Sequence, residues 1–105
     1  MRVLTVLCDV TKQKDVESAV DQTVKKFGAL HVVLASAGVA WPGMTLTSKD
    51  SLDMDRFEQV MKINVSGSAY AAKYGAVAMS KNKPVNERGE KGVIIFVSSV
   101  AAEEA

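Results

Sequence analysis

Polar or small residues follow each of three apolar runs in the sequence. Asp-Val-Thr follows residues 2–8, Ser-Ala-Gly occupies residues 36–38 directly after the second run, and a Ser pair follows residues 93–97. In an open parallel sheet, ligands bind outside the carboxyl ends of the strands, where such clusters would meet. Each cluster taken singly fits an ordinary turn. Their shared place at one sheet edge favours a binding or catalytic site.

Asn64 is a polar residue on the apolar face of a predicted long helix. Val60, Met61 and Val65 surround it in the sequence. A buried amide that finds no partner costs about 1 to 3 kcal/mol, so its side chain must be bonded. Two interpretations stay open. The amide either bonds neighbouring backbone, or it holds water or backbone in a catalytic relay near the strand ends.

Several other chemistries lack their residues. The sequence has no Gly-x-Gly-x-x-Gly loop and no Walker loop, so nothing in it is expected to cradle a diphosphate. No cluster of His, Cys or carboxylate residues has the spacing of a metal site. His31 is the single histidine and starts an apolar run instead of ending one. A serine hydrolase is therefore a poor fit.

Alternating strands and helices are expected to position these residues. The apolar runs at residues 2–8, 31–35 and 93–97 are typical of parallel strands that are buried on both faces. Apolar positions spaced by three and four predict an amphipathic helix over residues 12–26. We expect Thr11 to cap that helix and Gly28 to end it.

A second, longer helix is predicted after Asp53. Asp53 is the expected N-cap, and Leu52 and Phe57 are placed to form a hydrophobic staple across the first turn. Residues 39–52 and 81–92 carry Pro and Gly without period and are predicted to be loops. The order strand, helix, strand, helix, strand favours an α/β fold with right-handed crossovers.

Composition limits the class of protein. The chain has 105 residues, 48% of them apolar, and a net charge of +1 without a basic stripe, which disfavours nucleic acid as a partner. Cys8 is the only cysteine and no apolar run is long enough to span a membrane or form a signal peptide. We expect an intracellular protein, in the mitochondrial matrix or the cytoplasm.

The order of these segments resembles the short-chain dehydrogenases/reductases. The segments that carry the resemblance are CDVT, a helix ending in KFG, then LHVVLASAG, KINVSG and GVIIFVSSVAA, which together cover nearly the whole chain. The KDV and KKFG ends of the first helix and the charged insertion before GVII are most similar to the 3-hydroxyacyl-CoA dehydrogenase type that also acts on hydroxysteroids.

This resemblance implies the fold and the extent of the domain. The fold is part of a doubly wound parallel, Rossmann-like sheet with the pattern β-α-β-α-β, in which the chain supplies strands three to five. Residues 1–105 are then the central portion of a single dinucleotide-binding dehydrogenase domain, incomplete at both ends. Because the third strand does not touch the fourth in the order 3-2-1-4-5-6, residues 2–8 are expected to lack both ladder neighbours.

The resemblance also implies roles for individual residues. The parent protein is expected to use NAD or NADP and to interconvert a secondary alcohol and a ketone, of the 3-hydroxyacyl-CoA or hydroxysteroid class. A phenolate would take the alcohol proton. Ser99 is the implied catalytic serine that bonds the substrate oxygen, and Asn64 would hold the water of a proton relay. The implied cofactor contacts are Asp9 and the Val10 amide at the adenine ring, and Ala35, Ser36, Ala37 and Gly38 along the adenosine.

The sequence departs from the family pattern at several points. Ala35 replaces the first Asn of the Asn-Asn-Ala-Gly motif, and His31 stands where Asp is usual. The Gly-rich loop and the Tyr-x-x-x-Lys pair are both missing from the 105 residues, so the chain alone is predicted to be inactive. Tyr70 and Lys73 have a spacing one residue too short and are expected to be ordinary helix residues.

An alternative is an inactive short protein that uses its long helix for subunit interaction. In the family this helix packs against a partner subunit, and the parent is expected to be a homo-oligomer, a tetramer. Small residues would allow close approach, although they fit equally well a helix packed tightly on its own sheet. They are Ser66, Gly67, Ser68, Ala69, Ala71, Ala72 and Gly75.

Overall fold

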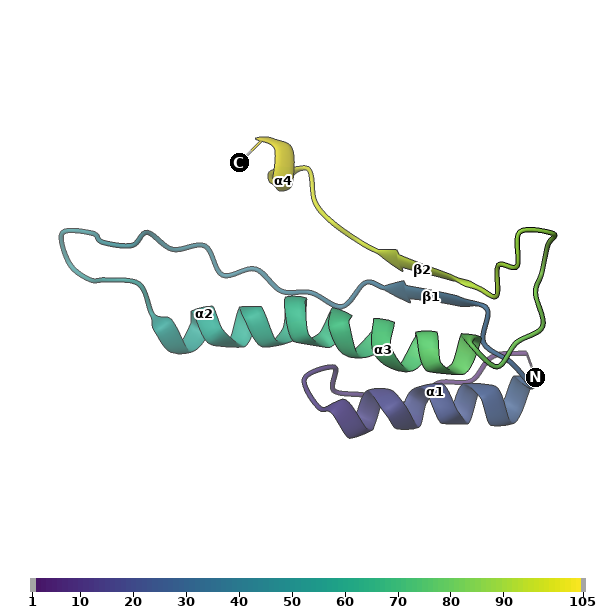
Figure 1. Ribbon diagram of the computed structural model, residues 1–105. Coiled ribbons are helices and arrows are strands. Elements are labelled where there is room, and N and C mark those ends of the chain that lie inside the picture. Colours follow the sequence, from purple (N-terminus) through teal and green to yellow (C-terminus); the bar gives the residue numbers. More distant parts are fainter. Residues whose placement is uncertain (1, 105) are drawn as a thin grey trace.

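Helices lie along one side of a short parallel sheet (Figure 1). The computed structural model describes residues 2–104. In chain order the elements are α1 (Gln13–Phe27), β1 (Val32–Ala35), α2 (Met54–Met61), the π-helical segment η1 (Lys62–Ser66), α3 (Gly67–Met79), β2 (Val93–Phe96) and α4 (Ala101–Glu104).

Helix α1 forms where the apolar periodicity predicts it, displaced by one residue. Gly28 ends it with a φ of 89°, and its N–H donates to the Val24 carbonyl at 2.7 Å. The prediction that Thr11 caps the helix is wrong. Lys12 occupies the N-cap position without a side-chain bond. The Thr11 hydroxyl donates to Asp9 Oδ1 instead, at 2.8 Å, because the Asp-Val-Thr segment forms its own side-chain turn.

The segments α2, η1 and α3 form the single long helix that the sequence predicts. Asp53 Oδ1 accepts hydrogen bonds from the N–H groups of Asp55 and Arg56, at 3.0 and 3.2 Å, which confirms the predicted N-cap. In η1 the N–H of Gly67 donates to the Lys62 carbonyl, five residues back. This π-bulge is a local widening of the helix that the apolar pattern did not indicate.

Strands β1 and β2 pair in parallel, from Val32 opposite Val93 to Ala35 opposite Phe96. The prediction that both faces of these strands are buried is wrong. Val32 is 55% exposed and Leu34 59% exposed. Figure 1 shows why: α1 and α3 lie on the same side of the sheet, and no described element covers the other side.

Residues 2–8 do not join the sheet, which corrects the prediction of a strand there and confirms that the segment lacks ladder neighbours among the described residues. Leu7 is fully exposed, at 100% of its reference surface. A groove lined by Val6 and Cys8 on one side and by Leu34 and Ala35 on the other separates this segment from β1. A ladder needs a neighbour within hydrogen-bonding distance, and none of the described residues supplies one.

The described chain is elongated. Its radius of gyration is 17.3 Å, whereas a compact chain of about 100 residues has a radius near 13 Å. Val16 and Met79 are the buried apolar residues among those described. Within residues 2–104, no helix has both the length and the apolar character needed to cross a membrane.

Candidate functional site

Two of the three predicted clusters follow the strands at the carboxyl end of the sheet. Because β1 and β2 are adjacent and parallel, the turn at residues 36–38 and the serines after β2 leave the sheet at the same edge. The N–H of Val97 donates to the Ala35 carbonyl at 3.3 Å, so the two strands stay paired up to the edge of the sheet. Beyond this bond the two segments diverge (Figure 1), so Ser98 and Ser99 share the sheet edge with the turn but are not bonded to it in the described chain.

The third cluster faces the same groove from its other side. Val10 lines the groove together with Ala35, Ser36 and Ala37, and Gly67 and Ser68 of α3 line it from below the sheet. A Cβ at position 67 would lie 2.9 Å from Val10 Cγ2, so glycine is needed for this approach.

Asp9 is held in a defined orientation beside this groove. Its Oδ1 accepts from the Thr11 hydroxyl at 2.8 Å and from the Thr11 N–H at 2.9 Å. These bonds, the side-chain bond first, hold the pKa of Asp9 below its ordinary value. Among the described residues, nothing donates to Asp9 Oδ2 and nothing accepts from the Val10 N–H.

Asn64 connects η1 to the loop after β1. Its Oδ1 accepts from the Val39 N–H at 2.9 Å, and its Nδ2 donates to the Val39 carbonyl at 2.8 Å. Of the two open interpretations, the structure shows the bond to neighbouring backbone. The expected burial of Asn64 is wrong: the side chain is exposed, because no described element packs over η1 at this point.

Ser99 lies just before the short helix α4. Its Oγ accepts from the Ala101 N–H at 3.2 Å, and its carbonyl accepts from the Ala102 N–H at 3.0 Å. A hydroxyl that accepts one bond keeps its own hydrogen free to donate. Ser99 can therefore donate to an oxygen atom in front of the sheet edge. Sequence reasoning missed α4, although a serine two residues before an Ala-Ala-Glu run is a typical helix start.

Lys73, Tyr74 and Cys8 lie outside the sheet edge or in surroundings that do not favour catalysis. Lys73 donates to Gln13 Oε1 at 3.1 Å, and the Tyr74 hydroxyl donates to the same oxygen at 2.7 Å, so they join α3 to α1. Lys73 is thus an ordinary helix residue, as expected. Burial, followed by the charges of Asp15 and Asp9, raises the pKa of the Cys8 thiol, which does not favour a nucleophilic thiolate.

The groove fits one half of a dinucleotide better than the other. Asp9 Oδ2 is an open acceptor next to an open donor, the Val10 N–H, and the edge of an adenine ring offers the matching donor and acceptor. The turn at residues 36–38 supplies a small-residue wall. The described residues contain no Gly-rich turn for a diphosphate. The residues present therefore fit the adenosine part of the cofactor.

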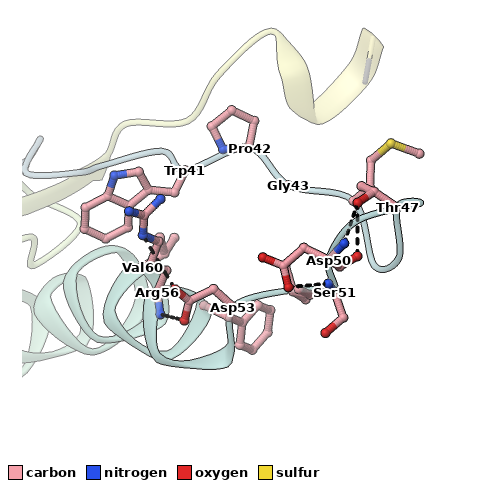
Figure 2. Close-up of a pocket in the computed structure, with 12 residues that line it drawn as sticks. Trp41, Pro42, Gly43, Thr47, Asp50, Ser51, Asp53, Arg56 and Val60 are labelled. Atoms are coloured by element: carbon pink, nitrogen blue, oxygen red, sulfur yellow. Dashed lines mark hydrogen bonds and ion pairs between the residues drawn. The ribbon is translucent and has the colours of Figure 1, made fainter.

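A hollow in the loop before α2 is a feature that sequence reasoning missed (Figure 2). It is lined by Trp41, Pro42, Leu52, Phe57 and Val60, among others. The only signal was several large apolar residues in a loop without period.

A parallel sheet with a small-residue turn and a serine at its carboxyl edge is typical of α/β proteins of the Rossmann type. The chain belongs to the short-chain dehydrogenase family. The family model described as short chain dehydrogenase matches residues 1–105.

Relatives and solved structures agree with this assignment. The chain is 42% identical over 96 residues to short-chain dehydrogenase reductase 3c of Arabidopsis thaliana, which covers 91% of the chain and 34% of that protein. It is 36% identical over 98 residues to 3-hydroxyacyl-CoA dehydrogenase type-2 of Bos taurus, covering 91% and 37%. The chain thus spans about a third of the length of these curated relatives.

The fold class is confirmed by the solved structures. A short-chain dehydrogenase/reductase from Serratia marcescens superposes with a TM-score of 0.80 at 27% identity, over 100% of this chain and 42% of that one. One from Mycobacterium marinum has a TM-score of 0.77 at 25% identity, over 95% and 36%. The chain is therefore an α/β, Rossmann-type segment of an oxidoreductase family.

Proposed function

We propose that this chain is the central part of an NAD(P)-dependent oxidoreductase that interconverts a secondary alcohol and a ketone, of the 3-hydroxyacyl-CoA or hydroxysteroid class. The observation that carries the proposal is that Ser99, the turn at residues 36–38 and the Asn64–Val39 contact all follow the strands at the carboxyl end of one parallel sheet. The similarity to the bovine 3-hydroxyacyl-CoA dehydrogenase supports the substrate class.

The chain's own residues would divide the work between binding and charge stabilisation. Asp9 and the Val10 N–H would hold the adenine edge, and Ala35, Ser36, Ala37 and Gly38 would line the adenosine. The free hydroxyl hydrogen of Ser99 would donate to the substrate oxygen and stabilise its developing negative charge. The dinucleotide, when bound, supplies the hydride acceptor or donor.

Asn64 would serve the proton relay through its position. Its side chain is bonded to the backbone of Val39, so it fixes η1 against the loop that leaves β1. It would hold the relay water with what the amide has left, one N–H and one lone pair of Oδ1, or with its main chain.

Cofactor contact can be tested on the chain by following backbone amide resonances during titration with NAD⁺ and, separately, NADP⁺. We expect shifts at Val10 and residues 35–38, and a loss of affinity of about tenfold or more in Asp9→Ala, because a charged hydrogen bond contributes about 1.5 to 3 kcal/mol.

Asp21→Ala is the matched control, because it removes an exposed carboxylate of α1 that does not line the groove. It should retain binding. Shifts confined to other residues, or equal affinity in Asp9→Ala and the unchanged chain, would contradict the proposed adenosine site.

We also propose that the parent protein assembles through the long helix. Its exposed side chains include apolar residues that recur every three or four positions, namely Met54, Phe57, Met61 and Val65. The exposed residues Ala69 and Ala76 follow further along α3. In an antiparallel twofold pair, the large side chains of one copy would meet the small ones of the other.

The two glycines of α3 do not belong to this surface. Gly67 and Gly75 are buried and face Val10 and Val33 of their own chain. Some of the small residues of α3 therefore serve packing inside the chain, as expected for a helix packed tightly on its own sheet.

Sedimentation tests the assembly. Val65→Asp should shift the chain towards the monomer, because it places a charge in the centre of the apolar surface. Val85→Asp, in the exposed loop before β2, is the control and should leave the distribution unchanged. Identical sedimentation of the Val65 variant and the unchanged chain would argue against this surface.

A further inference from the structure

The hollow between the loop at residues 41–53 and the start of α2 is separate from the groove that faces Asp9. Figure 2 shows Trp41 and Pro42 on the loop and Val60 on α2 around it. Its volume is about 280 Å³, close to the lower end of the roughly 300 to 1,000 Å³ that is typical of ligand sites. It can hold a single alkyl chain or ring, and it is too small for a folded partner.

The hollow begins next to the contact that connects η1 to β1. Trp41 is two residues after Val39, whose backbone bonds Asn64. Val60 precedes Asn64 by four residues, which is about one helical turn or 6 Å along the axis. The hollow and the candidate catalytic amide are therefore neighbours along both the loop and the helix.

The two carboxylates at the hollow are already engaged. Asp53 accepts from two backbone N–H groups of α2 and pairs with Arg56 Nε at 3.7 Å. Asp50 Oδ1 accepts from the Ser51 N–H at 2.8 Å. With these two carboxylates engaged, and with the Arg56 side chain 66% exposed to solvent, the lining available to a ligand is mainly the indole, proline ring, leucine, phenyl and valine side chains. Such a surface favours an uncharged apolar group.

We propose that this hollow binds the apolar part of the alcohol or ketone substrate, an uncharged alkyl chain or ring, with Trp41 and Val60 as its walls. The inference rests on the proposed function, since it extends the same site away from the reacting oxygen. It implies a preference for secondary alcohols with a bulky apolar group over small ones.

Trp41 allows a direct test, because it is the only tryptophan of the chain. The full chain is titrated, without dinucleotide, with 2-octanol and with 2-propanol while indole fluorescence is recorded. We expect 2-octanol to give a saturable blue shift as the indole loses water, and 2-propanol at equal concentration to give none. In Val60→Asn the apparent affinity for 2-octanol should fall about tenfold, the order expected for a disturbed apolar pocket.

Val77→Asn is the matched control, because it places the same polar residue on an exposed position of α3 outside the hollow. It should bind 2-octanol like the unchanged chain. Equal responses to the two alcohols, or an unchanged affinity in Val60→Asn, would overturn the proposal. So would a far-ultraviolet circular dichroism spectrum without helix, since the hollow exists only where α2 forms. Because no dinucleotide is present, failure of the proposed hydride transfer would leave the fluorescence result intact.

Discussion

Single side chains at the sheet edge determine how its loops are held. Asn64 illustrates this: one carboxamide satisfies both the N–H and the carbonyl of Val39. A carboxylate in its place would lack the donor, and an aliphatic side chain would lack both groups. The sequence marked Asn64 as unusual but left open what its amide bonds, because the partner is 25 residues away along the chain.

Asp9 shows how a local turn changes a charge. Replacing Thr11 by Val removes the hydroxyl bond, which is the main cause of the lowered pKa, and should raise the pKa of Asp9 towards its ordinary value. A titration of the Asp9 carboxyl resonance measures the change. Because the folded-state pKa is lowered, the carboxylate contributes to stability above its unfolded pKa, and the contribution is lost as the pH falls through the folded pKa. The variant should therefore lose less stability on acidification, and an unchanged Asp9 pKa would contradict the assignment.

At the scale of elements, the contact between α3 and β1 depends on a glycine. A Cβ at position 75 would lie 2.7 Å from Val33 Cγ2, which is too close for α3 to keep its place on the sheet. The other helix of this layer, α1, joins α3 through Gln13. The helical layer is thus positioned by a few specific contacts.

Gly75→Ala should separate α3 from β1. Overpacking of this kind costs about 1 to 3 kcal/mol, more than the roughly 1 kcal/mol that alanine gains over glycine in a helix. Amide hydrogen exchange of β1 would report the loss as a lower opening free energy. Adding Val33→Ala makes room for the new methyl group and should recover part of it. Ala76→Ser, on the exposed side of α3, is the control, and equal protection in all variants would argue against the contact.

At the scale of the whole molecule, the described chain has helices on one face of its sheet, and no described element covers the other face. The radius of gyration of 17.3 Å reflects this elongated arrangement. Residues 2–8 have no ladder partner among the described residues, and Leu7 is fully exposed. Stability should therefore differ strongly between segments of the chain.

Hydrogen exchange can measure this difference. In the chain of residues 1–105, the amides of residues 3–8 should exchange near the rate of an unfolded peptide, while those of α1 and α3 are protected. Thermal unfolding should be broad, because few contacts couple the segments. Strong protection at residues 3–8 together with a single sharp transition would contradict this picture.

Catalysis should likewise be absent from residues 1–105 alone. The sequence contains no Tyr-x-x-x-Lys pair to supply the base and no Gly-rich loop. We expect no change in nicotinamide absorbance with a hydroxyacyl-CoA or hydroxysteroid substrate, in the presence of NAD⁺ or NADP⁺. Measurable turnover, abolished by Ser99→Ala, would show that this expectation is wrong.

Local chemistry was readable from the sequence alone. The Asp53 cap, the Gly28 stop and the long helix follow from side-chain periodicity and capping, which depend on near neighbours. The family resemblance rests on the same ordered segments, and the comparisons confirm it.

Tertiary structure alone decided the rest. Which strand faces are covered, what Asn64 bonds and that Trp41 borders a hollow all depend on groups far away in sequence. For residues 2–8 the family strand order already indicated missing neighbours, and the structure shows that no strand forms without them. An apolar run predicts a strand only if a neighbouring strand completes its hydrogen bonds. Residues 32–35 have that neighbour in β2, and residues 2–8 have none within the described chain.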